Sequence, residues 1–313
     1  MTQKLAIVFP GQGSQSVGML NELYQHDIVK TTFAEASAAL GYDLWALVAN
    51  GPEADLNETH RTQPALLTAS VAIWRLWLQQ GGAAPAYLAG HSLGEYSALV
   101  CADVLSLGAA VKLVEQRGNY MQQAVLADVG GMSAIIGLDD ALIAKACAEA
   151  AQGEVVAPVN YNSPGQVVIA GHKAAVERAG ELCKAAGAKR ALPLPVSVPS
   201  HCALMRPAAE QLSTDLAALS FNSPQLPVVN NVDVSIAIDS AAIKDALVRQ
   251  LYSPVRWTET IEWLASNGVT DVIELGAGKV LSGLIKRIDK NLNSSSVNDQ
   301  ATLQSALTQL TQE

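Results

Sequence analysis

Ala86-Tyr-Leu-Ala-Gly-His-Ser-Leu-Gly-Glu95 is the stretch that decides the fold. Its apolar first half predicts a buried strand, and the Ala-, Leu- and Val-rich segment that begins at Ser92 predicts a helix. Between them, Gly90-His-Ser-Leu-Gly94 matches G-x-S-x-G, in which a serine occupies a sharp strand-to-helix turn. The start of that helix supplies unpaired N–H groups. We predict that Ser92 is a nucleophile and that the N–H of Leu93 holds an oxyanion; the plainer alternative is a helix N-cap.

Strands and helices on either side of this turn predict a parallel α/β sheet. A short apolar strand and three stretches with apolar residues at helical spacing lie around it, and further strands and helices follow near the C-terminus. Strands that alternate with helices form parallel sheets. The ranges that carry these patterns are 5–9, 32–40, 64–78, 106–124, 203–218, 227–230, 243–251, 255–267 and 271–275.

The middle of the chain has a different order of elements. Residues 128–198 predict a β-α-β-β-α-β unit, the ferredoxin-like arrangement, with a strong turn signal inside it. We expect this unit to be a small subdomain inserted into a large α/β-hydrolase-like domain formed by residues 1–127 and 199–313. From about residue 290 the Ser-, Asn- and Gln-rich composition predicts a loosely held tail.

The composition is that of a globular enzyme. Half of the 313 residues are hydrophobic and 16% are charged, which allows a large core. A net charge of −9 without a Lys- or Arg-rich run argues against nucleic acid as a partner. Because no stretch approaches the ~20 apolar residues of a membrane span and no signal-peptide pattern is present, we expect a cytoplasmic protein. The four cysteines lack ligand spacing, so we expect them to be reduced and no metal to be bound.

A nucleophilic serine needs a base, and the chain has five histidines. His201 lies in Val198-Pro-Ser-His-Cys202, an irregular segment where the chain re-enters the large domain, and it is our candidate. The others lie in polar segments, at a helix start or beside the serine itself: His26, His60, His172 and His91.

An α/β-hydrolase would place an acid between the serine and the histidine in the sequence. Asp128, Asp139 and Asp140 lie in this interval, but they flank the first strand and helix of the ferredoxin-like unit, which is not a usual hydrolase cap. A serine esterase or thioesterase that uses Ser92 and His201 is therefore the alternative interpretation. A carrier-binding scaffold without activity is a third.

Six short motifs are spread along nearly the whole chain. They are Phe9-Pro-Gly-Gln-Gly-Ser-Gln15, Thr62-Gln-Pro-Ala65, Gly90-His-Ser-Leu-Gly-Glu95, Gln116-Arg117, Asn162-Ser-Pro-Gly-Gln166 and Pro199-Ser-His201. Each is weak alone, and together they are specific. With them, the chain resembles the malonyl-CoA:acyl carrier protein transacylases of bacterial fatty acid synthesis.

The resemblance implies a catalytic set. Ser92 would carry the malonyl ester, and His201 would act first as base and then as acid. The backbone carbonyl of Gln250 would hold the other ring nitrogen of the histidine. The backbone N–H groups of Gln12 and Leu93 would form the oxyanion hole.

The resemblance also implies an acyl pocket. Arg117 would bind the malonyl carboxylate, and Gln63 would line the same pocket. His91, Asn162 and Gln166 would be further substrate-binding residues. By position alone, Arg117 is an ordinary mid-helix arginine that faces solvent, so this role comes from the resemblance.

The implied substrates are malonyl-CoA and the phosphopantetheine thiol of acyl carrier protein. We expect no cofactor and a monomeric protein. Lys189 and Arg190, at the start of the last strand of the 128–198 unit, are candidates for docking the acidic carrier protein or the CoA phosphates. Ordinary surface charge is the alternative for both.

Overall fold

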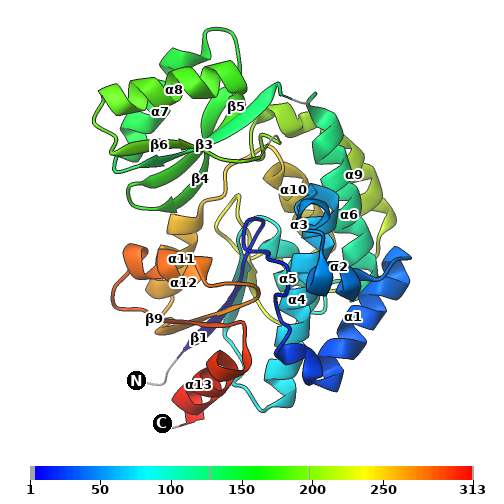
Figure 1. The fold of residues 1–313 in the computed structure, drawn as a ribbon. Coiled ribbons are helices and arrows are strands. Elements are labelled where there is room, and N and C mark those ends of the chain that lie inside the picture. Colours follow the sequence, from blue (N-terminus) through cyan, green and yellow to red (C-terminus); the bar gives the residue numbers. More distant parts are fainter. Residues whose placement is uncertain (1–3, 127, 197, 312–313) are drawn as a thin grey trace.

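The computed structural model describes residues 4–126, 128–196 and 198–311, which form two sheets with separate cores (Figure 1). The larger sheet has the strand order β7-β2-β1-β8-β9, and every neighbouring pair is parallel. Its strands are β1 (Leu5–Phe9), β2 (Tyr87–Gly90), β7 (Val228–Val229), β8 (Asp271–Leu275) and β9 (Asn293–Val297). The predicted parallel α/β fold is confirmed.

Helices cover both faces of this sheet (Figure 1). On β1, Ile7 and Phe9 belong to one core and Ala6 and Val8 to the other, because alternate side chains of a strand point to opposite faces. The first core contains residues of α1 (Asp27–Leu40), α2 (Leu44–Asn50), α3 (Glu53–Leu56), α4 (Thr59–Gln79), α5 (Gly94–Cys101), α6 (Leu107–Ala124), α9 (Arg206–Ala218) and α10 (Ser240–Gln250). The second contains residues of α11 (Trp257–Ser266) and α12 (Val280–Ile288). Two short 3-10 helices, Leu23–Gln25 and Ala203–Met205, complete this part.

The smaller sheet is antiparallel, with the order β4-β5-β3-β6. Its elements follow the chain as β3 (Gly130–Ile136), α7 (Asp140–Ala151), β4 (Val156–Ser163), β5 (Gln166–His172), α8 (Lys173–Ala185) and β6 (Arg190–Pro193). This is the predicted β-α-β-β-α-β order. Helices α7 and α8 pack on one face of the sheet, and the other face packs toward Cys202 and Leu204 of the larger body. The division at residues 127/128 and 198/199 stays a prediction, and residue 127 lies outside the described residues.

Backbone hydrogen bonds join the smaller sheet to the segment before α11 of the larger body. Val255, just before α11, donates to the carbonyl of Val159 at 2.8 Å and accepts from the N–H of Tyr161 at 3.0 Å. The hydroxyl of Thr258 also donates to the Tyr161 carbonyl. Strand β4 is thereby held against the larger body, which fixes one wall of the space between the two sheets.

The C-terminal segment corrects one prediction. Residues 293–297 form β9, paired in parallel with β8, and they lead to α13 (Gln300–Thr311). Leu303 and Ala306 of that helix are buried in the first core. The expectation of a loosely held tail is wrong because β9 is a polar edge strand whose backbone, rather than its side chains, supplies the pairing. Among the residues that the structure describes, no helix combines the length and the apolar character that crossing a membrane requires.

Candidate active site

Ser92 lies on the predicted strand-to-helix turn. Strand β2 ends at Gly90, α5 begins at Gly94, and Ser92 has a φ of 52°, which is unusual for a residue with a side chain. A Cβ on Gly90 would come within 1.9 Å of the Gly94 carbonyl carbon, and one on Gly94 within 2.0 Å of the Phe9 carbonyl oxygen. The turn therefore needs glycine on both sides of the serine, which explains the pattern in physical terms.

Asn231 holds this turn from the neighbouring strand. Its Oδ1 accepts from the backbone N–H of Ser92 at 2.7 Å, and its Nδ2 donates to the carbonyl of Gly90 at 2.6 Å. Asn231 lies two residues beyond β7, the neighbour of β2. Its role was not predicted from the sequence, although its place just after a strand of the parallel sheet is a usable signal.

Ser92, His201 and Gln250 form a continuous hydrogen-bonded row. Ser92 Oγ lies 2.7 Å from His201 Nε2, and His201 Nδ1 lies 2.7 Å from the backbone carbonyl of Gln250. Because a carbonyl only accepts, Nδ1 carries the ring proton and Nε2 is free to accept the serine proton. His201 is 4% exposed. Burial, and after it the positive charge of Arg117, lower the pKa of His201 to about 3, which keeps the imidazole neutral and ready to act as a base.

Among the described residues, no acid of the kind that a hydrolase would use hydrogen-bonds to this histidine. Asp139 instead caps α7, where its Oδ1 accepts from the N–H of Ala141 at 2.9 Å. Asp140 lies in the first turn of the same helix. Within the described residues, Nδ1 of His201 lies 2.7 Å from the Gln250 backbone carbonyl, and no carboxylate hydrogen-bonds to the ring. The site is therefore a serine–histidine pair supported by a neutral oxygen.

Arg117 is buried beside Ser92, not exposed as its position alone would suggest. The side chain is 2% exposed. Its Nη1 donates to Gln63 Oε1 at 2.8 Å, its Nη2 donates to Gln250 Oε1 at 3.0 Å, and Nη2 lies 3.5 Å from Ser92 Oγ. Its Nε has no hydrogen-bond partner among the described residues. The guanidinium is thus held next to Ser92 by neutral amide oxygens, which leaves it able to bind an anion.

These groups meet at a cavity of about 370 Å³ between the two sheets. Ser92, Leu93, Arg117 and His201 line it from the larger body, and Gln12 lines it from the loop after β1. In the part of the chain that the structure describes, the backbone N–H groups of Gln12 and Leu93 have no protein acceptor. Both are therefore available to an oxygen of a bound substrate.

A larger hollow of about 1420 Å³ lies beside α8 and β6. Ser92, Arg117 and His201 do not line it, so its size does not make it the candidate site. The two hollows share Met132 and Leu194–Val196 as lining residues. The smaller cavity, which Ser92, Arg117 and His201 line, is therefore the candidate site.

The remaining predicted site residues fall into three groups. His91 lines the cavity, and its Nε2 lies 2.8 Å from Oδ1 of Asn162. Gln63 and Gln250 do not line the cavity themselves and instead support Arg117. Gln166 lies apart from the site: its Oε1 accepts from Arg287 at 2.6 Å, and it does not line the cavity. The structure therefore gives no support to Gln166 as a substrate-binding residue.

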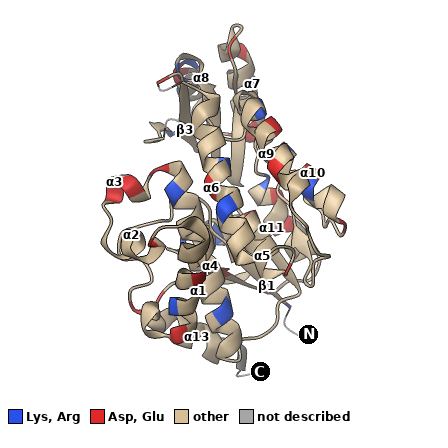
Figure 2. Cartoon of the chain, turned by 90° about the vertical axis from the view of Figure 1, so that its right-hand side faces the viewer, with Lys and Arg blue, Asp and Glu red and all other residues tan. Residues whose placement is uncertain are grey.

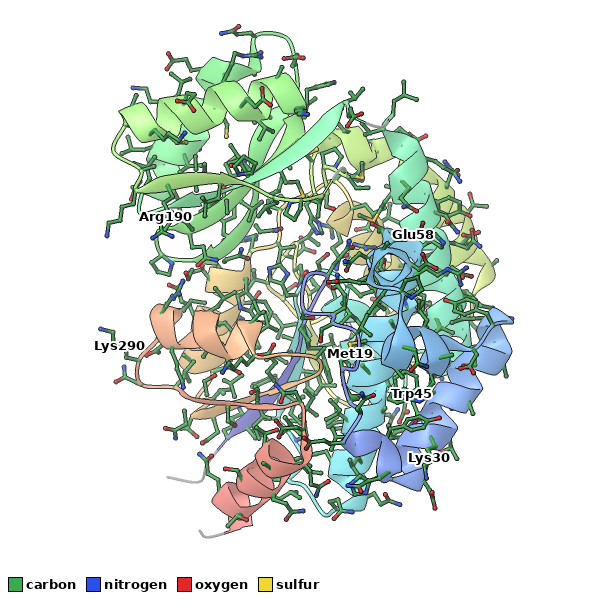
Figure 3. The ribbon with its side chains drawn as sticks, viewed as in Figure 1. Met19, Lys30, Trp45, Glu58, Arg190 and Lys290 are labelled. Atoms are coloured by element: carbon green, nitrogen blue, oxygen red, sulfur yellow. The ribbon has the colours of Figure 1, made fainter. Side chains whose placement is uncertain are left out.

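Lys189 and Arg190 also lie away from the cavity. Figure 3 shows Arg190 projecting outward from the smaller sheet, whereas Glu58, a cavity-lining residue, lies near the helices of the larger body. Strand β6 runs from Arg190 toward Leu194, which does line the cavity, a distance of roughly 13 Å at about 3.3 Å per residue. The two cations are thus outside reach of the reacting atoms. The described residues contain no group of three or more His, Cys, Asp and Glu placed to hold a metal ion.

Comparison with known proteins identifies one family. The family model of the acyl transferase domain matches residues 6–306. The malonyl CoA-acyl carrier protein transacylase of Salmonella typhimurium (strain LT2) is 67% identical over 310 residues, which cover 99% of this chain and 100% of that protein. A crystal structure of an acyl carrier protein S-malonyltransferase from Vibrio cholerae is 69% identical, with a TM-score of 0.95 over 97% of this chain and 99% of that chain.

A third relative was solved with its partner. This malonyl-transacylase, in complex with its type II PKS acyl-carrier protein, is 61% identical, with a TM-score of 0.97 over 98% of this chain and 100% of that chain. Matches of this length and identity, on a chain with this serine–histidine site, leave one assignment. The chain belongs to the acyl transferase domain family and groups there with the malonyl CoA-acyl carrier protein transacylases.

Proposed function

We propose that the chain transfers a malonyl group from malonyl-CoA to the phosphopantetheine thiol of acyl carrier protein, through an ester on Ser92, and so supplies fatty acid synthesis. The observation that carries the proposal is the row from Ser92 through His201 to the Gln250 carbonyl, with two contacts of 2.7 Å, beside the buried Arg117. The relatives named above support malonyl as the acyl group and a carrier protein as the acceptor.

The first half-reaction loads the serine. Ser92 Oγ attacks the thioester carbonyl while His201 Nε2 takes its proton. The carbonyl oxygen becomes an oxyanion that the N–H groups of Gln12 and Leu93 stabilise; one such donor contributes about 3 kcal/mol. The carbon–sulfur bond then breaks, the sulfur receives the proton from His201, and CoA leaves as its thiol.

The second half-reaction runs the same steps in reverse. The thiol of the carrier's phosphopantetheine gives its proton to His201 and attacks the ester carbonyl. The oxygen–carbon bond to Ser92 breaks, and His201 returns the proton to the serine. Because both half-reactions use one site, the kinetics are ping-pong. The thioester of malonyl-CoA supplies the acyl group, the carrier thiol accepts it, and His201 carries the proton in both half-reactions.

Arg117 selects the acyl group in this proposal. A guanidinium matches a carboxylate through two parallel hydrogen bonds. The buried cation, held by Gln63 and Gln250, pairs with the free carboxylate of malonyl, while an acetyl group leaves it unpaired. His91, whose ring is fixed by Asn162, forms part of the cavity wall around the acyl chain.

Lys189 and Arg190 serve the carrier protein rather than the chemistry. Both lie on the outside of the smaller sheet, so they contact a macromolecular partner without contacting the acyl group. An acidic carrier protein suits them, since complementary surface charge raises association rates. We propose that the chain acts as a monomer with this partner.

One experiment separates the possible activities. The protein is incubated with malonyl-CoA alone, and the intact mass and the peptide that contains Ser92 are measured; phosphopantetheinylated carrier protein is then added. We expect a stable malonyl adduct on Ser92 that disappears as malonyl-carrier forms, and no adduct in Ser92→Ala. Steady release of free malonate without carrier would favour a thioesterase, and the absence of an adduct in the wild type would refute the proposal.

A further inference from the structure

Glu95 is a buried carboxyl group that the proposed reaction does not use. It lies three residues after the nucleophile on α5 and is 2% exposed. Its Oε2 accepts from the side-chain Nε2 of Gln250 at 2.8 Å and from the backbone N–H of Asn231 at 3.0 Å. Its Oε1 receives no hydrogen bond from the described residues. A carboxyl is costly to bury, so its contacts need an explanation.

Gln250 connects this carboxyl to Arg117. Its Oε1 accepts from Arg117 Nη2 at 3.0 Å, while its Nε2 donates to Glu95 and, at 3.1 Å, to the carbonyl of Ser92. Its backbone carbonyl is the one that holds His201. One residue therefore supports the base through its main chain and the guanidinium through its side chain.

The side-chain amide of Gln250 has two ends of nearly equal shape and opposite hydrogen-bonding character. If the amide were rotated by half a turn, its NH₂ group would face the guanidinium of Arg117, which also only donates. The hydrogen bond that supports the guanidinium would be lost, and two donors would be in contact. The acceptors around Gln250 Nε2 decide which of the two amide orientations is stable. They are Glu95 Oε2 and the carbonyl of Ser92, and the contact with Glu95 is the shorter of the two.

We propose that Glu95 is a positioning residue for acyl selectivity: its Oε2 holds the Gln250 amide with Oε1 toward Arg117, which aims the guanidinium at the carboxylate end of the acyl group. This inference rests on the proposed function, because it concerns the arginine assigned there to malonyl. Glu95 itself touches neither the substrate nor the reacting atoms.

The proposed role is that of a hydrogen-bond acceptor, and it comes in addition to the attraction between the Glu95 carboxylate and the Arg117 charge. Burial raises the pKa of Glu95 to about 7. Near neutral pH the carboxyl is therefore partly protonated, and its unpartnered Oε1 is free to carry that proton while Oε2 accepts in both forms. A glutamine at position 95 retains an oxygen for the same two donors, so Glu95→Gln keeps the arrangement and Glu95→Leu loses it.

The test compares acylation of the full chain by malonyl-CoA and by acetyl-CoA, as kcat and KM for each. We expect Glu95→Leu to raise the KM for malonyl-CoA about tenfold, the scale of one hydrogen bond to a charged group, and to change acetyl transfer less than about threefold. Glu95→Gln should keep the malonyl preference of the wild type. If Glu95→Gln is as poor as Glu95→Leu, or if malonyl and acetyl transfer fall together, the inference is wrong.

Glu274 provides a matched control. It is the same residue type, is 0% exposed, and holds the start of α12 through the N–H groups of Leu281 and Ser282, away from the cavity. Glu274→Gln and Glu274→Leu should lower stability to different extents without changing the malonyl-to-acetyl ratio. A changed ratio in these variants would mean that loss of stability alone alters selectivity.

A double variant tests whether Glu95 acts through Gln250. Gln250→Met removes the amide and keeps the backbone carbonyl that holds His201. In that background Glu95→Leu should have no further effect on the malonyl-to-acetyl ratio, and an effect as large as in the wild type overturns the inference. If Glu95→Leu does not fold, Gln250→Met decides the matter, because an unchanged ratio in that variant also overturns it. A wild type that forms no malonyl adduct refutes the proposed function itself and is seen before any variant is made.

Discussion

Arg117 is an uncommon residue, because its charge is buried beside Ser92 and its hydrogen-bond acceptors are the neutral amide oxygens of Gln63 and Gln250. Removing one partner of a buried ion pair costs roughly 3–5 kcal/mol. In the proposed function, the carboxylate of malonyl pairs with the guanidinium, and an acetyl group has no carboxylate to do so. Arg117→Ala should therefore lose malonyl transfer by more than about a hundredfold while acetyl transfer is kept or increased, measured as kcat/KM for each CoA ester.

The control for that variant is Arg75→Ala on α4. Arg75 pairs with Glu35 at 2.7 Å on the surface of the larger body and does not line the cavity. This change should leave the ratio of malonyl to acetyl transfer as it is in the wild type. Equal losses of both transfers in Arg117→Ala would contradict the carboxylate role.

His201 predicts a particular pH dependence. Burial first, and Arg117 second, lower its pKa from 6.5 to about 3. The base form therefore persists as pH falls, and kcat/KM for acylation should stay flat well below pH 6.5. In Arg117→Ala, with acetyl-CoA as substrate, the acid limb should move to higher pH because one charge that disfavours the imidazolium is gone. A wild-type limb near 6.5, or a limb that does not move in the variant, would contradict this account.

The same lowered pKa sets the sign of a stability effect. Between pH 6.5 and about 3, the unfolded chain binds a proton at His201 and the folded chain does not. The free energy of unfolding therefore falls as pH drops through this range, as far as this residue is concerned. His201→Asn should make the acid side of the stability profile less steep, as urea unfolding at a series of pH values would reveal. An unchanged slope would contradict burial as the cause.

The sequence predicts the position of a residue that belongs to a short local motif. It does not predict contacts between residues that are far apart in the chain. The strand-to-helix turn at Ser92 was predictable because strand, turn and helix lie together in ten residues. Asn231 and Glu95 were not assigned roles. The contacts of Asn231 depend on β7 being the neighbour of β2 in the sheet, and those of Glu95 depend on the position of Gln250 at the end of α10. Gln166 was assigned from its motif, yet its partner is Arg287, 121 positions away. Sequence spacing alone does not give such pairs.

At the scale of elements, the contact between α4 and α6 places Arg117 beside Gln63. Gly118 makes this approach possible: a Cβ there would lie 2.5 Å from the Cα of His60, at the start of α4. Gly118→Ala should push the helices apart, lower the free energy of unfolding by about 1–3 kcal/mol and raise the KM for malonyl-CoA more than that for acetyl-CoA. Thermal or urea unfolding and steady-state kinetics are the measurements.

Gly108 on the same helix is the matched control. A Cβ at this position would meet only the Cβ of Ala39, at an ordinary 3.6 Å. Because alanine is the better helix former, Gly108→Ala should be neutral or stabilise by up to about 1 kcal/mol, with unchanged kinetics. Equal destabilisation by the two substitutions would show that the effect is a general one of α6, not of its contact with α4.

The elements that were predicted well have strong local signals. The turn Asn162-Ser-Pro-Gly165 separates two strands, and the Ala-rich helices on either side have clear apolar faces, so the β-α-β-β-α-β order was readable. Strand β9 was missed because Asn293-Ser-Ser-Ser-Val297 has one buried side chain and resembles a loop in composition. Its pairing with β8 is made by backbone groups, so the side-chain pattern of the segment does not indicate a strand.

At the scale of the whole molecule, the candidate active site is formed by residues from both the larger body and the smaller sheet. Strand β4 is bonded to Val255 of the larger body, and Met132 of the smaller sheet faces the cavity. In Figure 2 acidic and basic positions are interspersed over the visible elements, with acidic residues on α3. The net charge of −9 makes approach of an acidic carrier unfavourable unless it meets a local basic surface. Carrier docking is therefore where surface charge should have its largest effect.

Lys189 and Arg190 test that argument. The double change Lys189→Ala with Arg190→Ala should raise the KM for carrier protein about three- to tenfold at low salt, since each exposed pair contributes less than about 1 kcal/mol. Acylation by malonyl-CoA should be unaffected if the partner is the carrier, and weakened if the two cations bind CoA phosphates instead.

Lys290→Ala, which removes an exposed lysine near the end of α12, is the control (Figure 3). High salt should reduce the difference in carrier KM between the wild type and the double variant, because exposed charges are screened. A wild-type carrier KM that does not change with salt would exclude a docking role for this pair.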